Sequence, residues 1–334
     1  MTERSGFICA GNWIVDLVHD ITDWPEESHL VRIGAQTRSI GGGAANVISA
    51  LSRLQTGLPL WPMGAVGDDE QGRFIADECR ALGLPTENLT LKSGVPTAHT
   101  HVMSVAGRSR TFFYQGGAND ALCATDFPAG TFAGTPARIF YLGYLTLLGE
   151  LDRIETSGTT GAARVLERAK AAGLTTCIDL VSIQHPSYEE IVGCALPHID
   201  YLILNEVEAA FSLGSQIDGT PEASELLDMA SDLVARGVQK AVVVHSVQNV
   251  AWAGADGERL TVPVTPLAVD QIESNLGAGD AFCAGLLYGI HEGWAPATAI
   301  RLATECAKSS LRDLTATGAI PPLSDIDISE RTDD

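Results

Sequence analysis

Short apolar runs alternate with longer amphipathic stretches through the second half of the sequence, and this alternation is regular from about residue 138. The short runs have the length and composition of buried strands, whereas the longer stretches carry apolar residues at helical spacing. Such alternation predicts βαβ units and therefore a parallel sheet with helices on both faces. The expected strands are 138–142, 174–180, 201–204 and 240–245, and the expected helices are 158–172, 206–213, 221–236 and a closing helix at 298–314.

The first half of the sequence begins with elements of the same kind. Residues 6–10 predict a buried first strand, and we expect Asp16 at the end of that strand. A glycine turn then leads into a helix over 41–54, followed by a strand at 58–67 and an amphipathic helix at 69–82. These elements extend the same doubly wound arrangement toward the N-terminus.

Two separated stretches show a different pattern. In residues 29–40 apolar and polar positions partly alternate, which is typical of a strand with one solvated face. Residues 97–114 have the same character on either side of Ala106–Gly107, where we expect a hairpin turn. Together they predict a small sheet that stands apart from the core.

The simplest architecture is one doubly wound α/β domain over residues 1–323. The sheet is mainly parallel and flanked by helices, and a small β-sheet lid is formed by about 12–40 and 96–117. The remaining residues, 324–334, read as a polar acidic tail that frays. Ligands of such open sheets bind at the carboxyl ends of the strands, where the glycine turns also fall.

The charge is strongly acidic, since 21 Lys and Arg stand against 42 Asp and Glu and give a formal net charge of −21. This balance argues against a nucleic-acid partner and an anionic membrane surface, because both require clustered cations. The seven cysteines are scattered without C-x-x-C spacing, as expected of small core residues in a reducing compartment. We therefore expect a cytoplasmic protein, and the exposed edges of the lid favour a homodimer formed through it.

The chemistry is concentrated in the turn before a late apolar helix. Gly277, Ala278 and Gly279 have little side-chain bulk, so an anion can approach their N–H groups at the helix start. Asp280 follows directly and can either cap the helix or act on a substrate beside that anion. A dinucleotide fingerprint is the competing interpretation, but Phe282 occupies its third glycine position.

Two regions in this order resemble the signatures of the ribokinase-like, or PfkB-type, carbohydrate kinase family. They are G-G-G-A-A-N at Gly41–Asn46 and G-A-G-D-A-F-C-A-G at Gly277–Gly285. Features between them agree in order, namely Asp16, G-G-A-N-D at Gly116–Asp120 and N-E-V-E at Asn205–Glu208. The resemblance extends over essentially the whole sequence.

The resemblance implies a role for each matching residue. Asp280 becomes the base that takes the hydroxyl proton, and the backbone of Leu276, Gly277, Ala278 and Gly279 becomes the anion hole. No G-x-x-x-x-G-K-[S/T] motif is present, so this anion hole has to replace a phosphate-binding lysine. The residues implied on the acceptor side are Asp16, Gly42, Gly43, Asn46 and Asn119. Those implied on the nucleotide side are Asn205, His245, Leu276, Gly277, Gly279 and Thr304. Asn205 and Glu208 are expected near Mg²⁺, with water between them and the ion.

Three segments depart from the family pattern. Ser274 stands where several members have an aspartate that helps to bind a monovalent cation, so such a cation is not implied here. Residues 245–250 replace both glycines of T-x-G-x-x-G with valine, which affects the nucleotide side. The D-x-N-x-R found midway in the family becomes Asp179–Ile183 and lacks the arginine.

The sequence therefore predicts a kinase that uses ATP and Mg²⁺ to phosphorylate a primary hydroxyl of a sugar. A nucleoside kinase of the same fold remains open, because the same fold serves ribosyl acceptors. So does a non-catalytic regulator that binds a sugar or a nucleotide. Retention of Asp280 between its glycines argues against the regulator, while the altered nucleotide strand argues for it.

Overall fold

The computed structural model describes residues 4–105, 108 and 110–328, and a nine-stranded sheet forms the centre of this part of the protein. Strands β11, β10, β9, β8, β1, β4 and β5 run parallel, and β12 and β13 add an antiparallel edge. In sheet order the strands are β13 (Arg259–Pro263), β12 (Asn249–Gly254), β11 (Ala241–His245), β10 (Tyr201–Asn205), β9 (Thr175–Leu180), β8 (Ile139–Leu145), β1 (Phe7–Gly11), β4 (Leu60–Gly67) and β5 (Leu89–Lys92).

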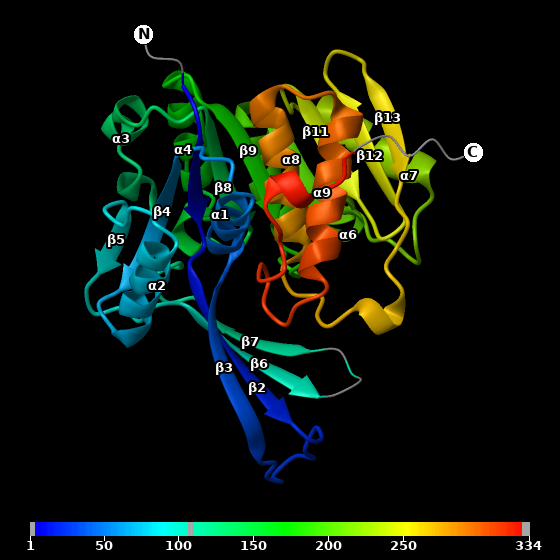
Figure 1. Ribbon diagram of the computed structural model, residues 1–334. Helices are drawn as coiled ribbons and strands as arrows, with labels where there is room; N and C mark the ends of the chain where they lie inside the picture. The colour runs from blue at the N-terminus through cyan, green and yellow to red at the C-terminus, as the bar shows by residue number, and fades with distance from the viewer. Residues whose placement is uncertain (1–3, 106–107, 109, 329–334) are drawn as a thin grey trace.

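Helices cover both faces of this sheet, so each face has its own apolar core. On one face lie α1 (Gly43–Arg53), α2 (Glu70–Ala81), α8 (Ala278–Glu292) and α9 (Pro296–Ser310), of which α1, α8 and α9 are in front of the sheet in Figure 1. On the other face lie α3 (Ala129–Gly134), α4 (Gly161–Ala171), α5 (Tyr188–Ala195), α6 (Glu206–Ser212) and α7 (Ala223–Ala235). The expected doubly wound α/β fold is confirmed.

The central strands are continuous apolar runs because neither face meets water. All five residues of β1, F-I-C-A-G, are buried, and so are the first four of β11, A-V-V-V. Sequence periodicity located these strands for that reason. It did not locate β12 and β13. These two strands follow β11 in the sequence and form an antiparallel ribbon at the edge of the sheet.

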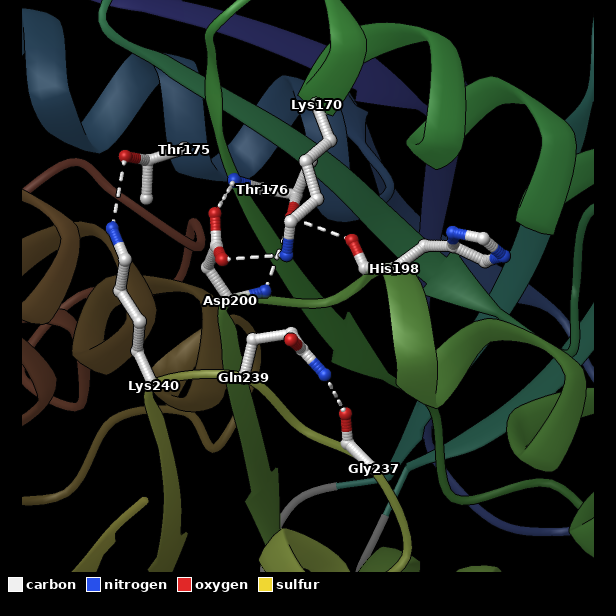
Figure 2. A network of polar contacts seen from close by, with 8 residues as sticks. All are labelled: Lys170, Thr175, Thr176, His198, Asp200, Gly237, Gln239 and Lys240. Atoms are coloured by element: carbon white, nitrogen blue, oxygen red, sulfur yellow. Dashed lines mark hydrogen bonds and ion pairs between the residues drawn. The ribbon is translucent and has the colours of Figure 1, made fainter. Parts of the chain in front are cut away.

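A buried polar network fixes the amino ends of β9 and β10 (Figure 2). The carboxylate of Asp200 pairs with Lys170 Nζ at 2.8 Å and accepts the backbone N–H of Thr176 at 3.1 Å. The Thr176 hydroxyl donates to the carbonyl of His198 at 2.7 Å. Because these contacts lie at the edge away from the strand carboxyl ends, they stabilise the frame without entering the candidate site.

A separate four-stranded sheet projects from the carboxyl edge of the main sheet and is the predicted lid (Figure 1). Its strands are, in order, β3 (Ile33–Gly41), β2 (Ile14–Ile21), β6 (His99–Val105) and β7 (Thr111–Gln115). The expected turn at Ala106–Gly107 lies outside the described residues. One expectation was wrong: Asp16 lies within β2 of the small sheet, not at the end of the first strand, which stops at Gly11.

The C-terminal elements also differ in extent from their prediction. The closing helix α9 begins at Pro296, whose ring is tolerated in the first turn, and ends at Ser310. Leu323, Ile326 and Ile328 pack against the core between the sheet and helices α1, α2, α8 and α9. The described beginning of the expected tail therefore lies on the protein. Residues 329–334 of that tail are outside the described part. No helix in the described residues is long and apolar enough to cross a membrane.

Candidate active site

Asp280 lies in the first turn of α8 and is 3% exposed. Its Oδ2 accepts a hydrogen bond from Asn46 Nδ2 at 2.8 Å and another from the Tyr144 hydroxyl at 3.0 Å. Asp280 does not cap α8, because the cap position is Gly277 and this helix start has no hydrogen bond from a capping residue. The capping interpretation of Asp280 is therefore wrong, and its carboxylate faces other elements.

The turn before Asp280 presents unpaired backbone donors. Gly277 adopts a left-handed φ of 74°, and a Cβ there would overlap with Ala316, so glycine is required. Within the described residues we find no acceptor for the N–H groups of Gly277, Ala278 and Gly279. The N–H of Leu276 differs, because it donates to Ser274 Oγ at 3.0 Å. Three of the four predicted anion-hole donors are thus free, and the space around the Gly279 Cα is open.

Burial is the main influence on the Asp280 carboxyl and raises its pKa. The hydrogen bonds from Asn46 and Tyr144 act against this rise because they stabilise the ionised form. Burial likewise raises the pKa of Asp179, and the neighbouring charge of Asp280 raises it further. An aspartate with a raised pKa that still has two donors on one oxygen is suited to accept a proton near neutral pH.

The early glycine turn makes room for neighbouring groups of the site. A Cβ on Gly41 would overlap with the Asp16 carboxylate, and one on Gly43 would lie 2.7 Å from the Tyr144 ring. Gly42 adopts a φ of 89° and lies against the Asn12 carbonyl. The glycines therefore admit Asp16 and Tyr144 to the space beside Asp280.

A cavity of about 650 Å³ opens in front of these residues at the carboxyl ends of the strands. Asp16, Gly42, Asn46 and Asp280 line it, whereas Gly43 does not. Burial raises the pKa of Asp16 to about 6, and hydrogen bonding with Thr100 acts in the opposite direction. Three aromatic residues complete the wall of this cavity, namely Phe112 and Tyr114 from the lid and Tyr144 from the end of β8.

Asn119 does not line this cavity. It is fully buried, its Oδ1 accepts the N–H of Trp13 at 3.2 Å, and its Nδ2 donates to the Tyr114 hydroxyl at 3.4 Å. Asn119 thus connects the root of the lid to a residue of the cavity wall. Its predicted influence on the acceptor pocket can act through Tyr114 and through the backbone of Trp13, which precedes the lining residue Ile14.

Asn205 and Glu208 form a capping box at the start of α6. Asn205 Oδ1 accepts the N–H groups of Val207 and Glu208, and Glu208 Oε2 accepts the N–H of Asn205 at 3.0 Å. Glu208 Oε1 accepts the Ser182 hydroxyl at 2.9 Å. Burial raises the pKa of Glu208 to about 7. The described residues contain no group of three or more His, Cys, Asp or Glu that could hold a metal ion.

A second cavity, of about 580 Å³, meets the first at the late turn. The two cavities share Asn205, His245, Asn275, Ala278 and Gly279. Removal from water lowers the pKa of His245 to about 4, and its ring lies tilted by 37° against that of Phe282, with centroids 4.6 Å apart. Thr304 lines the second cavity, although its hydroxyl donates to the Ile300 carbonyl at 2.8 Å.

The valines that replace the two family glycines belong to this second cavity. Val247 lies in the tight turn between β11 and β12, and Val250 pairs with His245 across that hairpin. Ser246 Oγ closes the turn by accepting the N–H of Asn249 at 3.1 Å. The departure from the family pattern therefore changes the wall of the cavity to an apolar surface.

Sequence reasoning missed the aromatic residues of the first cavity, above all Tyr144. The predicted strand was 138–142, whereas β8 continues to Leu145, and nothing in the pattern I-F-Y-L-G-Y-L shows that Tyr144 has a φ of 59°. A tyrosine at the carboxyl end of a parallel strand is the signal that could have found it. Phe112 and Tyr114 alternate along one lid strand, so period-two spacing could have assigned them to the inner face.

A doubly wound fold with two cavities that meet at a glycine turn beside the buried Asp280 is the arrangement expected of a phosphotransferase of the ribokinase type. The family model "pfkB family carbohydrate kinase" matches residues 7–323, so the protein belongs to the PfkB carbohydrate kinase family. The predicted resemblance is confirmed. The protein is accordingly a sugar or nucleoside kinase of this family, which uses ATP and a hydroxyl acceptor.

Three comparisons illustrate the relationship. Fructokinase-1 of Zea mays is 29% identical over 293 residues, which is 86% of the present sequence and 83% of the fructokinase. A ribokinase of Arabidopsis thaliana complexed with ribose and ATP has a TM-score of 0.76 at 21% identity, and the match covers 96% of the present sequence and 97% of the ribokinase. A nucleoside kinase of Burkholderia thailandensis in complex with inosine has a TM-score of 0.70 at 18% identity, covering 96% and 94%. Both solved structures share the fold.

Proposed function

We propose that this protein transfers the γ-phosphate of ATP to a primary hydroxyl of a sugar, with Asp280 as the base. The observation that carries the proposal is the position of Asp280 beside the turn where the two cavities meet. One cavity has polar groups suited to sugar hydroxyls, and the other has an apolar wall suited to a nucleobase. A hydroxyl in the first can thus approach a phosphate at the turn.

The acceptor side offers hydrogen-bonding groups that match vicinal hydroxyls. Asp16 accepts hydrogen bonds, and Gly42 lets a sugar ring lie against the backbone. The nucleotide side offers Val250, Phe282 and Leu311 to the flat faces of a base. Relatives named fructokinase support a sugar as acceptor.

The transfer itself needs few groups. Asp280 takes the proton of the acceptor hydroxyl, whose oxygen forms the new bond to the γ-phosphorus while the bond to the bridging oxygen of ADP breaks. The free N–H groups of Gly277, Ala278 and Gly279 stabilise the charge on the phosphate oxygens. The Asp280 proton leaves to solvent after the product departs.

The residues present fit a magnesium ion that is held mainly by phosphates and water. Both oxygens of Glu208 already accept hydrogen bonds, so Glu208 and Asn205 are suited to bind water molecules of the ion rather than the ion itself. Bound Mg²⁺ would neutralise charge on the phosphates. Glu208 would orient that water shell from a fixed, buried position.

A nucleoside is the second candidate acceptor, and the aromatic wall favours it. Phe112, Tyr114 and Tyr144 line the first cavity, and aromatic rings stack on nucleobases as well as on sugar rings. A nucleoside kinase also shares this fold. The two candidates differ in what the rings contact, so an acceptor panel separates them.

We also propose a homodimer formed through the outer face of the lid, in a cytoplasmic protein. Trp24 and Phe113 stack there with centroids 6.3 Å apart, although they are 46% and 50% exposed. The proposal of a cytoplasmic location rests on the cysteines instead, because seven free cysteines, five of them buried, suit a reducing compartment.

The dimer is tested by its mass. Light scattering should give twice the subunit mass of 35.2 kDa, and Phe113→Glu should give the mass of one subunit. A monomeric wild type would exclude the dimer.

ADP formation by the purified protein tests the function. The assay uses Mg²⁺, ATP and a panel of pentoses, hexoses, sugar acids and nucleosides, with a blank that lacks an acceptor. We expect turnover above the blank with one or a few sugars. Turnover with nucleosides alone would replace the sugar by the second candidate, and ADP formation that never exceeds the blank would contradict both.

A further inference from the structure

Two donors converge on one oxygen of Asp280 and leave its other oxygen free. Asn46 Nδ2 and the Tyr144 hydroxyl both donate to Oδ2, at 2.8 Å and 3.0 Å. Among the described residues no group donates to Oδ1. A carboxylate held in this way cannot rotate freely, so Oδ1 is the oxygen left to face a substrate.

The fold holds Tyr144 in an unfavourable backbone conformation. Its φ of 59° lies in the left-handed region, which costs a residue other than glycine on the order of 1 kcal/mol. The Tyr144 N–H donates to Asp179 Oδ1 at 3.0 Å, and this bond secures the conformation. Backbone strain of this kind persists where the surroundings fix it, often at functional sites.

The early glycine turn is matched to the same tyrosine. A Cβ on Gly43 would lie 2.7 Å from Tyr144 Cδ1, so the ring occupies space that only glycine leaves open. Gly43 therefore leaves room for the ring of Tyr144, while Asp179 holds its backbone. In this arrangement the hydroxyl donates to Asp280.

We propose that Tyr144 is a positioning residue for the phosphoryl transfer, whose hydroxyl fixes Asp280 Oδ2 so that Oδ1 takes the proton of the acceptor. The inference rests on the proposed function of Asp280. It adds a residue from the end of β8 to the groups that hold Asp280. Tyr144 touches the base, and it acts on the reaction through that base.

The Tyr144 bond also stabilises the ionised form of Asp280. Two acidic groups from other elements do the opposite and raise the pKa of Asp280, namely Glu208 of α6 and Asp16 of β2. Three further ionisable groups face it, and the charge of Asp280 raises the pKa of each of them: Asp179 of β9, Tyr141 of β8 and Cys283 of α8. Loss of the Tyr144 hydroxyl should therefore raise the pKa of Asp280.

The test compares Tyr144→Phe with the wild type and with Tyr114→Phe. Tyr114 is a matched control because it lines the same cavity and its hydroxyl has no bond to Asp280. We expect Tyr144→Phe to lower kcat about 10-fold and to move the acid limb of the kcat/KM profile upward by about one pH unit. The KM for ATP should change little, and Tyr114→Phe should not move the acid limb.

A second readout does not need activity. In protein labelled with ¹³C at the aspartate carboxyl carbon, the Asp280 resonance is assigned by its loss in Asp280→Asn and titrated in wild type and Tyr144→Phe. A higher midpoint in the variant supports the proposal, and equal midpoints overturn it. An unmoved acid limb with only a lower kcat also overturns it. A wild type without acceptor-dependent turnover contradicts the proposed function, while the titration still decides the bond.

Discussion

Asn46 Nδ2 lies 2.8 Å from Asp280 Oδ2, and this hydrogen bond joins residues 234 positions apart in the sequence. Asn46 lies in the first turn of α1, just after the early glycine turn, and Asp280 in the first turn of α8, just after the late one. The bond is buried, so it is stronger than an equivalent bond in water. The two family signatures are thus connected directly at the reacting centre.

The first prediction concerns this bond. Asn46→Ala should lower kcat by about 10-fold or more, because Asp280 loses one of the two donors that orient it. The folded structure should persist, since helix α1 tolerates alanine. Steady-state kinetics and far-UV circular dichroism measure the two effects. Ser49→Ala is the matched control, because Ser49 is a buried polar residue of the same helix and its hydroxyl has no partner among the described residues. Equal loss in both variants would show general damage to α1.

The second prediction concerns the glycine that accommodates Asp16. A Cβ on Gly41 would overlap with the Asp16 carboxylate, so Gly41→Ala should displace that group. We expect the KM for the acceptor to rise about 10-fold with little change in the KM for ATP. Gly193→Ala is the control, because no atom lies within 4 Å of a Cβ at Gly193. A parallel rise in both KM values would contradict a role confined to the acceptor side.

The third prediction concerns magnesium. Glu208→Gln keeps the capping box, because glutamine also reaches the N–H of Asn205, but removes the charge near the phosphates. The Mg²⁺ concentration for half-maximal rate should rise about 10-fold. Glu225→Gln makes the same change in the capping box of α7 and should leave this concentration unaltered. An unchanged Mg²⁺ requirement in Glu208→Gln would confine Glu208 to its structural role.

The fourth prediction concerns the pH dependence of stability. Burial raises the pKa of Asp152 from 3.8 to about 7, so the folded protein binds this proton more tightly than the unfolded state. The contribution of Asp152 to stability is therefore present below pH 4 and is lost as the pH rises toward about 7. Asp152→Asn carries no such charge, so its free energy of unfolding should fall less between pH 5 and 7, by roughly 1.4 kcal/mol per pH unit. Urea unfolding at pH 5 and at pH 7 measures this free energy for both proteins. An equal fall in the wild type and in Asp152→Asn would contradict the prediction.

The sequence predicted those elements that depend on the residues of one segment alone, such as strands and glycine turns. The strands of the parallel sheet are buried on both faces, and A-V-V-V of β11 shows this directly. Gly277 was assigned correctly to a turn because its conformation and its crowding by Ala316 both require glycine. The small sheet was recognised from partly alternating residues, but the expectation of one solvated face was wrong for β3, whose first six residues are all exposed.

The remaining features depend on contacts between distant segments. Asp16 was expected at a strand end because β2 follows β1 after only Asn12 and Trp13. Gly43 was expected against a sugar, yet the space beside it holds the Tyr144 ring, which comes from a strand much later in the sequence. No periodicity in the sequence reports such a pairing. Residues that face each other across elements appear only when the fold is known.

Turnover of Asp280→Asn is the measurement that tests the account most directly. Asparagine keeps the size of the aspartate and can still accept the bonds from Asn46 and Tyr144, but it cannot take a proton. With the acceptor that the wild type uses, kcat should fall by roughly 10²-fold or more, while calorimetry should give unchanged affinity for ATP. Near-normal turnover of Asp280→Asn would show that another group accepts the proton, and the proposed mechanism would be wrong.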